Sequence, residues 1–269
     1  MSESQYTINL NEIEDVSKPV FAGVQFDSRP AAMRHLKVAK EVVDRFGGTG
    51  AVGLDIGSKY GLFRRVVKEY GISAIRLDVV VRDDKDGLIV GNGKKLPFND
   101  GVLDFVVVSH VLAHIDDLPP FMSEIRRALK PTGKLFILQN NRYGWWKYWG
   151  YYIKRNDRAL HYRTFSKWDI RELLRKNGFA INSMKSPYYF YLHSKFSDLC
   201  YRFDRKYGGI IPLWLATQWL VVAEASAASD DGGRKIKLSL AAKPLIEVAA
   251  FTHSVAMKAL ELFIRATHK

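Results

Sequence analysis

A glycine-rich turn and a carboxylate downstream of it are the first features of the sequence that could bind a ligand. Residues 52–61 read VGLDIGSKYG, in which a short apolar run leads into Gly57 and Gly61. A turn of this kind, between a buried strand and a helix, exposes backbone N–H groups at the carboxyl end of a sheet. Asp78 lies 23 residues after Asp55, at the end of the next β-rich run, where a carboxylate can bind the two hydroxyls of a ribose. The two features together favour a ribose-bearing ligand at that edge of the sheet.

Three histidines, His110, His114 and His161, are the candidates for a general base, because histidine titrates near neutral pH. A base is useful where the reacting group is a hydroxyl, and a packed or surface position is the alternative for each histidine. His110 and His114 are four residues apart in HVLAH, but the glutamate of the metalloprotease motif is missing between them. We therefore expect no metal site.

Alternating helix and strand patterns surround these residues. Helical periodicity is found at 31–46, 62–70, 118–129 and 166–176, and β-rich apolar runs at 51–56, 74–81, 104–109, 135–139, 179–184 and 218–223. The strand-like runs of the first half are apolar without alternation, which is typical of parallel strands covered on both faces. The order of the elements predicts an α/β fold in which helices cover both faces of a mostly parallel sheet.

Five motifs in a fixed order carry a resemblance to a known family. They are Leu54–Gly61 (LDIGSKYG), Asp78, Asn92–Phe98 (NGKKLPF), Asp104–Ile115 (DFVVVSHVLAHI) and Glu124–Gly133 (EIRRALKPTG). With these motifs the chain resembles the class I S-adenosylmethionine-dependent methyltransferases, specifically the small-molecule branch called type 11 or ubiquinone-biosynthesis-like. The resemblance covers about residues 50–225. It implies a Rossmann-like methyltransferase fold with a seven-stranded sheet.

The resemblance also implies S-adenosyl-L-methionine as the cofactor. The candidates for binding it are Asp55, Gly57, Ser58, Gly61, Asp78, Asn92, Gly93 and Ser109. By this resemblance Asp55 and Gly57 would orient the loop near the methionine moiety, and Gly61 would begin the helix beneath it. Asp78 would hold the ribose.

The remaining candidates belong to the adenine and to the reacting methyl group. By the same resemblance Asn92 and Gly93 would lie along the adenine, and Ser109 and His110 would form the floor beside the methyl group. Two positions depart from the family. Lys59 replaces the middle glycine of the loop, so its cation must point out of the pocket, and Asn92 replaces an aspartate, so its carbonyl oxygen must accept from the amine. These departures leave a non-catalytic binding or scaffold protein with the same fold as an alternative to an enzyme.

The net charge of +13 is concentrated in one segment, because residues 142–207 hold 15 Lys and Arg against five Asp and Glu. Seven of the ten residues 143–152 are aromatic, and three of these are tryptophan. Aromatic and cationic side chains together suit a bilayer surface with anionic lipids, the stacked bases of RNA in an RNA methyltransferase, or a cap over the active site or a protein interface. The density of tryptophan and the apolar run 210–215 favour the membrane. We therefore expect a small-molecule or lipid-linked acceptor and no nucleic acid.

The sequence divides into a core and flanking segments. These are an N-terminal segment 1–30, a methyltransferase domain 31–225 with a basic, aromatic-rich acceptor side over 142–215, a linker 226–238 and an amphipathic C-terminal helix 239–269. The single cysteine, Cys200, excludes an intramolecular disulfide and any site that needs two thiols. We expect no signal peptide and no membrane-spanning run, and hence a cytoplasmic protein, peripheral at the inner face of the membrane. The oligomeric state is left open.

Overall fold

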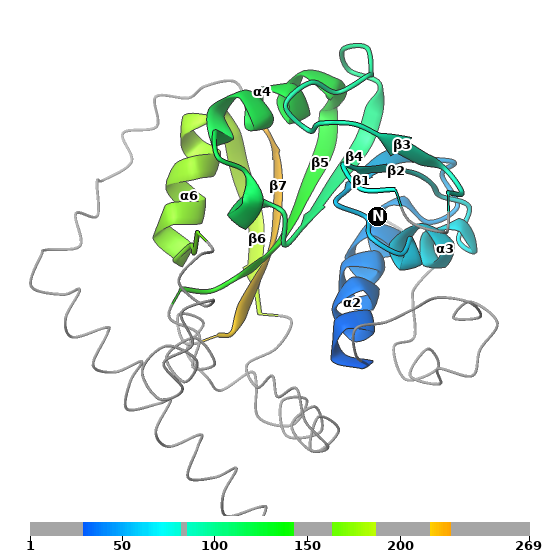
Figure 1. The fold of residues 1–269 in the computed structure, drawn as a ribbon, viewed down its shortest axis with the longest axis horizontal. Helices are drawn as coiled ribbons and strands as arrows, with labels where there is room; N and C mark the ends of the chain where they lie inside the picture. The colour runs from blue at the N-terminus through cyan, green and yellow to red at the C-terminus, as the bar shows by residue number, and fades with distance from the viewer. Residues whose placement is uncertain (1–28, 82–84, 143–162, 187–215, 227–269) are drawn as a thin grey trace, which may run out of the picture.

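A computed structural model describes residues 29–81, 85–142, 163–186 and 216–226, which form a seven-stranded sheet with helices packed on it (Figure 1). The strands are β1 (Val52–Ile56), β2 (Ser73–Asp78), β3 (Leu88–Val90), β4 (Leu103–Ser109), β5 (Leu129–Asn140), β6 (Phe179–Lys185) and β7 (Gln218–Ala225). Their order in the sheet is β3-β2-β1-β4-β5-β7-β6. The pairs from β3 to β5 are parallel, and β7 is antiparallel to both β5 and β6. The predicted mostly parallel, seven-stranded sheet is confirmed.

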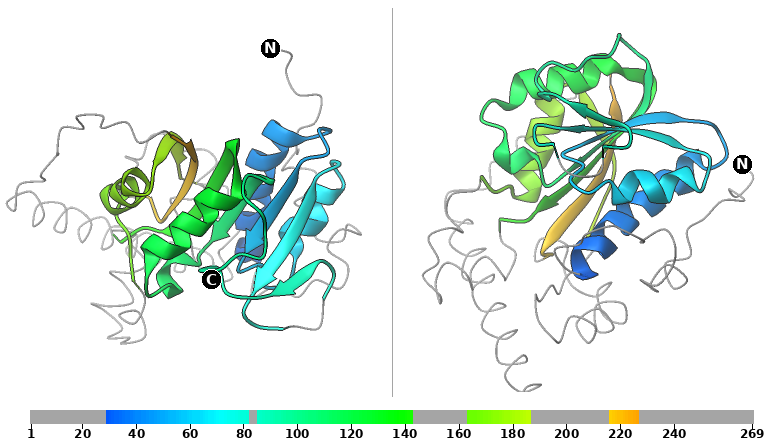
Figure 2. Two further views of the ribbon diagram at one scale, coloured as in Figure 1. Left: turned by 90° about the horizontal axis from the view of Figure 1, so that it is seen from above. Right: turned by 45° about the vertical axis from the view of Figure 1, so that its right-hand side comes forward.

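Helices cover both faces of this sheet, as predicted (Figures 1 and 2). Helices α2 (Arg29–Phe46) and α3 (Leu62–Lys68) pack on one face, and α4 (Leu118–Ala128) and α6 (Lys167–Lys176) pack on the other. Helix α6 begins at a capping box, in which the Ser166 side chain accepts from the Asp169 N–H and the Asp169 carboxylate accepts from the Ser166 N–H.

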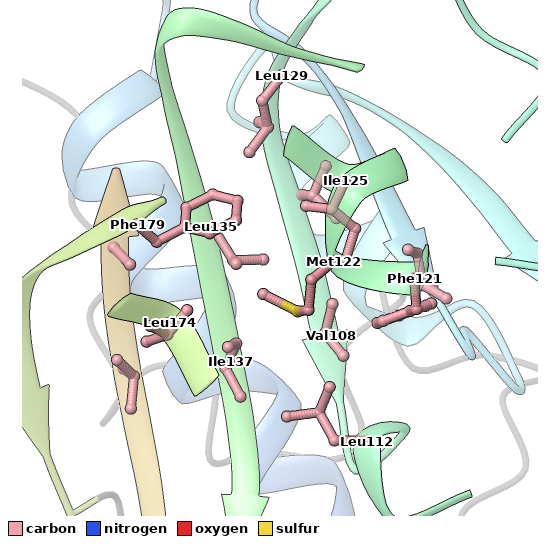
Figure 3. Packing of buried hydrophobic residues seen from close by; sticks show 14 of the residues in the cluster. Val108, Leu112, Phe121, Met122, Ile125, Leu129, Leu135, Ile137, Leu174 and Phe179 are labelled. Carbon is pink, nitrogen blue, oxygen red and sulfur yellow. The ribbon is translucent and has the colours of Figure 1, made fainter. Parts of the chain in front are cut away.

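The two apolar layers meet at the central strands. Phe105 and Val107 of β4 face α2 and α3, whereas Val106 and Val108 face α4 and α6, and all four are at most 1% exposed. Figure 3 shows the second layer, with Met122 of α4 directed onto β4 and β5. Burial on both faces explains why β4 is an unbroken apolar run in the sequence.

The structure shows that two predicted strand boundaries were wrong and that one strand was missed. Strand β2 ends at Asp78 instead of Val81, because the Asp78 side chain accepts a hydrogen bond from the Val80 N–H at 3.1 Å and turns the chain. Strand β5 begins directly after α4, where a loop was predicted, because Leu129 pairs with Leu103 ahead of a register shift. Strand β3 was not predicted, because its three residues are too few to show a pattern.

Several predictions fall on residues outside those described. They concern His161, the parts 143–162 and 187–215 of the basic, aromatic-rich region 142–215, most of the segments 1–30 and 226–238, and the helix at 239–269. These stay predictions. Within the described ranges, no helix combines the length and the apolar character that crossing a bilayer requires.

Candidate functional site

The candidate residues gather at the carboxyl ends of the parallel strands, on either side of β1. Strand β1 pairs with β2 on one side and with β4 on the other, so the chain leaves neighbouring strands in opposite directions at this point. Gly57 follows β1, Asp78 ends β2 and Ser109 ends β4. In open parallel sheets a ligand binds at such a switch point, outside the carboxyl ends of the strands.

The loop between β1 and α3 has a backbone that suits a closely approaching ligand. Gly57 (φ 73°) and Gly61 (φ 70°) have left-handed conformations, and so does Lys59 (φ 43°) between them. The Gly57 N–H donates to the Leu77 carbonyl at 2.8 Å, which ties the start of the loop to β2. A Cβ at Gly57 would overlap the Val111 side chain. The glycine predicted from sequence is therefore required by the close approach of the segment after β4.

Asp78 joins the end of β2 to this loop. Its Oδ2 accepts from the Lys59 N–H at 3.1 Å, and its Oδ1 accepts from the Val80 N–H at 3.1 Å. The side chain is half-buried, and each carboxylate oxygen keeps a lone pair for a further donor. Asp78 thus stands where a ribose could donate its hydroxyls.

Three consecutive valines beside Asp78 are exposed, and they were not among the predicted site residues. Val79, Val80 and Val81 are 70%, 48% and 52% exposed. They were read as the end of a buried strand, and no local signal in the sequence distinguishes the two cases. Apolar side chains next to a ribose-binding carboxylate could contact the base of a nucleoside, because burying their surface against it is favourable.

Asp55 in β1 and Ser58 in the loop are both buried, and both lie next to a buried arginine. Asp55 is directly opposite Arg76 in the pairing of β1 and β2, and the Ser58 hydroxyl accepts from Arg76 Nε at 3.3 Å. Burial raises the pKa of Asp55 to about 7, the Arg76 guanidinium opposes this rise, and the Asp78 carboxylate adds to it. Both side chains support the loop from inside.

The two residues expected along the adenine have local roles in the fold. Asn92 is exposed, and its side-chain carbonyl accepts from the Lys94 N–H at 2.9 Å, so the acceptor expected to meet an amine already closes a turn. Gly93 is buried, and a Cβ there would press on the Phe121 ring of α4. The absence of a side chain at Gly93 therefore serves packing.

The end of β4 supplies the remaining candidates. Ser109 is 7% exposed, and its Oγ has no hydrogen-bond partner within the described ranges. His110 follows in a left-handed conformation (φ 58°) with its N–H donating to the Leu138 carbonyl at 2.7 Å. His114 is exposed at the end of a 3₁₀ turn, Leu112–His114, so the two histidines do not lie on one face of an α-helix. The left-handed conformation of His110, a non-glycine residue directly after a strand, is of a kind that clusters at functional sites.

Comparison with known proteins agrees with this geometry. The profile of a methyltransferase-domain family matches residues 31–183. A ubiquinone/menaquinone biosynthesis C-methyltransferase from Haemophilus ducreyi is 33% identical over 118 residues, which are 39% of this chain and 42% of that one. The chain therefore spans less than half the length of this curated relative.

Solved structures share the fold at low sequence identity. An S-adenosylmethionine-dependent methyltransferase from Thermotoga maritima has a TM-score of 0.53 and 18% identity over 72% of this chain and 88% of that chain. A Burkholderia thailandensis 1,6-didemethyltoxoflavin N1-methyltransferase, solved with its substrate and S-adenosylhomocysteine, has a TM-score of 0.51 and 16% identity over 81% of this chain and 87% of that chain. These likenesses show the fold of the matched part of the chain.

Proposed function

This chain belongs to the methyltransferase-domain family, and from that premise we propose that it transfers a methyl group from S-adenosyl-L-methionine to a small-molecule or lipid-linked acceptor. The observation that carries the proposal is the Asp78 carboxylate, which lies against the left-handed loop 57–61 at the switch point of the sheet. The relatives and structural neighbours named above are methyltransferases, which supports the same assignment.

The residues at this edge fit the cofactor. Asp78 would accept the ribose hydroxyls, and the exposed Val79 would contact the adenine. The loop backbone would face the methionine moiety, with Asp55 and Ser58 holding it from below. The left-handed backbone of Gly57, Lys59 and Gly61, which carries no Cβ at two of these three positions, agrees with this placement.

The protein's contribution to the chemistry is mainly positional. The cofactor, when bound, supplies an electrophilic methyl group, and an in-line displacement gains much of its rate from alignment of the two reactants. A base is needed only where the acceptor is a hydroxyl. His110 is the described histidine at the end of β4 and is the candidate for that proton, while Ser109 beside it can orient the acceptor.

Asp78 allows a direct test by equilibrium binding of S-adenosylhomocysteine. Asp78→Ala should weaken binding about tenfold or more, because it removes charge-assisted hydrogen bonds to the ribose. The matched control is Asp104→Ala. Asp104 also accepts from a backbone N–H, that of Val52 at 2.9 Å, but it lies at the opposite edge of the sheet. Equal affinities in the two variants would reject the ribose assignment.

The acceptor and its location are inferred from the sequence. Residues 142–207 carry most of the net charge together with the aromatic cluster 143–152, and they follow β5 on the acceptor side of the family. We propose that this region brings a cytoplasmic enzyme to an anionic membrane surface, where a lipid-linked acceptor is available. Flotation with vesicles of phosphatidylglycerol and phosphatidylcholine should recover the protein, and vesicles of phosphatidylcholine alone should recover much less. Equal recovery, or binding to RNA without binding to vesicles, would contradict membrane association.

A further inference from the structure

Arg76 is a charged residue in the middle of a strand, yet it is only 1% exposed. Arginine is seldom buried to this extent unless its donors are paired. Strand β2 carries it between two apolar residues, Ile75 and Leu77, and its side chain enters the layer beneath the loop that follows β1. No step of the proposed reaction uses it.

The guanidinium joins two segments that are far apart in the sequence. Its Nη2 donates to the Lys59 carbonyl at 2.8 Å and its Nε to the Ser58 hydroxyl at 3.3 Å, so two of its donors hold the loop 57–61. Its Nη1 donates to the Asp86 carbonyl at 3.1 Å, in the turn before β3. One planar group therefore joins the loop 57–61 to the turn before β3. The forked arrangement of the arginine donors allows these bonds to form at the same time.

The peptide groups of Lys59 are held from two sides. Asp78 accepts from the Lys59 N–H, and Arg76 donates to the Lys59 carbonyl. Lys59 has a left-handed conformation that is unfavourable for a residue with a Cβ, so it needs such support. The guanidinium also lies directly under the start of α3, because a Cβ at Gly61 would be 2.8 Å from Arg76 Cζ.

We propose that Arg76 is a positioning residue for the methyl donor, which preorganises the loop 57–61 without touching the ligand. Its contacts reach Ser58 and the carbonyl of Lys59, whereas Asp78 is left to bind the ribose. The assignment rests on the proposed function, since the loop is taken to face the methionine moiety. A preorganised loop raises affinity because less ordering remains to be done on binding.

Arg64 provides a matched control. It is a second arginine beside β2, with Nη1 donating to the Ala74 carbonyl at 2.6 Å and Nε to the Asp86 carboxylate at 3.0 Å. Both arginines hold the residues around Asp86, but the hydrogen bonds of Arg64 within the described ranges go to Ala74 and Asp86 and not to the loop 57–61. Loss of either side chain should destabilise the turn before β3, and only loss of Arg76 should loosen the loop 57–61.

The experiment compares Arg76→Met, Arg76→Lys and Arg64→Met with the wild type in the full chain. S-adenosylhomocysteine affinity is measured by calorimetry, and hydrogen exchange is measured for the amides of residues 57–61. Arg76→Met should weaken binding about tenfold, the loss expected for a hydrogen bond from a charged group, and should speed exchange of the loop. Arg76→Lys should lie between, because lysine keeps the charge without the fork. Arg64→Met should leave both readouts close to wild type.

Two results would overturn the proposal. One is an equal loss of affinity in Arg76→Met and Arg64→Met, which would make both arginines merely structural. The other is wild-type affinity and loop exchange in Arg76→Met or, if that variant does not fold, in Arg76→Lys. If the wild type itself does not bind S-adenosylhomocysteine, the proposed function fails, and exchange at residues 57–61 alone decides whether Arg76 holds the loop.

Discussion

The buried carboxyl of Asp55 makes the stability of this protein depend on pH in an unusual direction. Burial raises its pKa in the folded protein from the ordinary 3.8 to about 7. Between these two values the folded state keeps the proton while the unfolded state releases it. The contribution of Asp55 to the free energy of unfolding should therefore be greatest at or below about pH 4 and should be lost as the pH rises through 7.

The magnitude follows from this interval. Each pH unit between 3.8 and about 7 contributes about 1.4 kcal/mol, so the full effect is about 4 kcal/mol. Asp55→Asn removes the titration and keeps the shape of the side chain. The free energy of unfolding of the variant minus that of the wild type should therefore rise by about 3 kcal/mol from pH 5 to pH 8, because about two pH units of the interval lie in that range.

The assay is urea denaturation of both proteins at pH 5, 6, 7 and 8. Any loss of hydrogen bonding caused by the substitution is the same at every pH, so only the change in the difference between the two proteins is diagnostic. Parallel curves for wild type and Asp55→Asn over this range would show that Asp55 is ionised in the folded protein, and would contradict a pKa raised by burial.

Three further variants test the fold around the site. Glu124 accepts from the Leu96 N–H and pairs with Arg127. These contacts, and chiefly the hydrogen bond from Arg127, lower the pKa of Glu124 from 4.5 to about 2. The contribution of the Glu124 carboxylate to the free energy of unfolding is present above pH 4.5 and lost toward pH 2. In acid titrations followed by circular dichroism, Glu124→Gln should therefore lose less stability than the wild type, and an equal loss would contradict the pairing. Met122→Ala should cost about 3 kcal/mol in urea denaturation by leaving a cavity in the layer of Figure 3, and a cost below about 1 kcal/mol would contradict that packing. Lys59→Gly should raise the free energy of unfolding by about 1 kcal/mol, because glycine adopts the left-handed conformation without the cost of a Cβ, and lower stability would contradict that strain. The same variant should leave S-adenosylhomocysteine binding intact if the lysine points away from the ligand.

Much of the fold could be predicted because the central strands carry their signal locally. The run Asp104–Ser109 has apolar side chains on both faces, which only a covered strand requires. Boundaries were less predictable where tertiary contacts set them. Strand β2 stops at Asp78 because its side chain binds the next turn, and β5 starts at Leu129 because Leu103 lies beside it.

The site was predictable at the level of position and less so at the level of role. Gly57, Asp78 and Ser109 lie together because parallel strands end at one edge, which the order of elements implies. Arg76 could not be found in this way, because an arginine within SAIRLD reads as a solvent-facing residue. Its burial depends on carbonyl groups in two distant loops, at Lys59 and Asp86, and no local pattern reports them.

Calorimetric titration of this chain with S-adenosylhomocysteine tests directly whether it binds the methyl donor at the proposed site. The product of the methyl donor keeps the ribose and the adenine, so it engages Asp78 and the loop 57–61 without any need to know the acceptor. We expect saturable binding at one site per chain, weakened in Asp78→Ala and unchanged in Asp104→Ala. Absence of binding by folded protein at millimolar ligand would contradict it, and would favour a protein that keeps the fold without the activity.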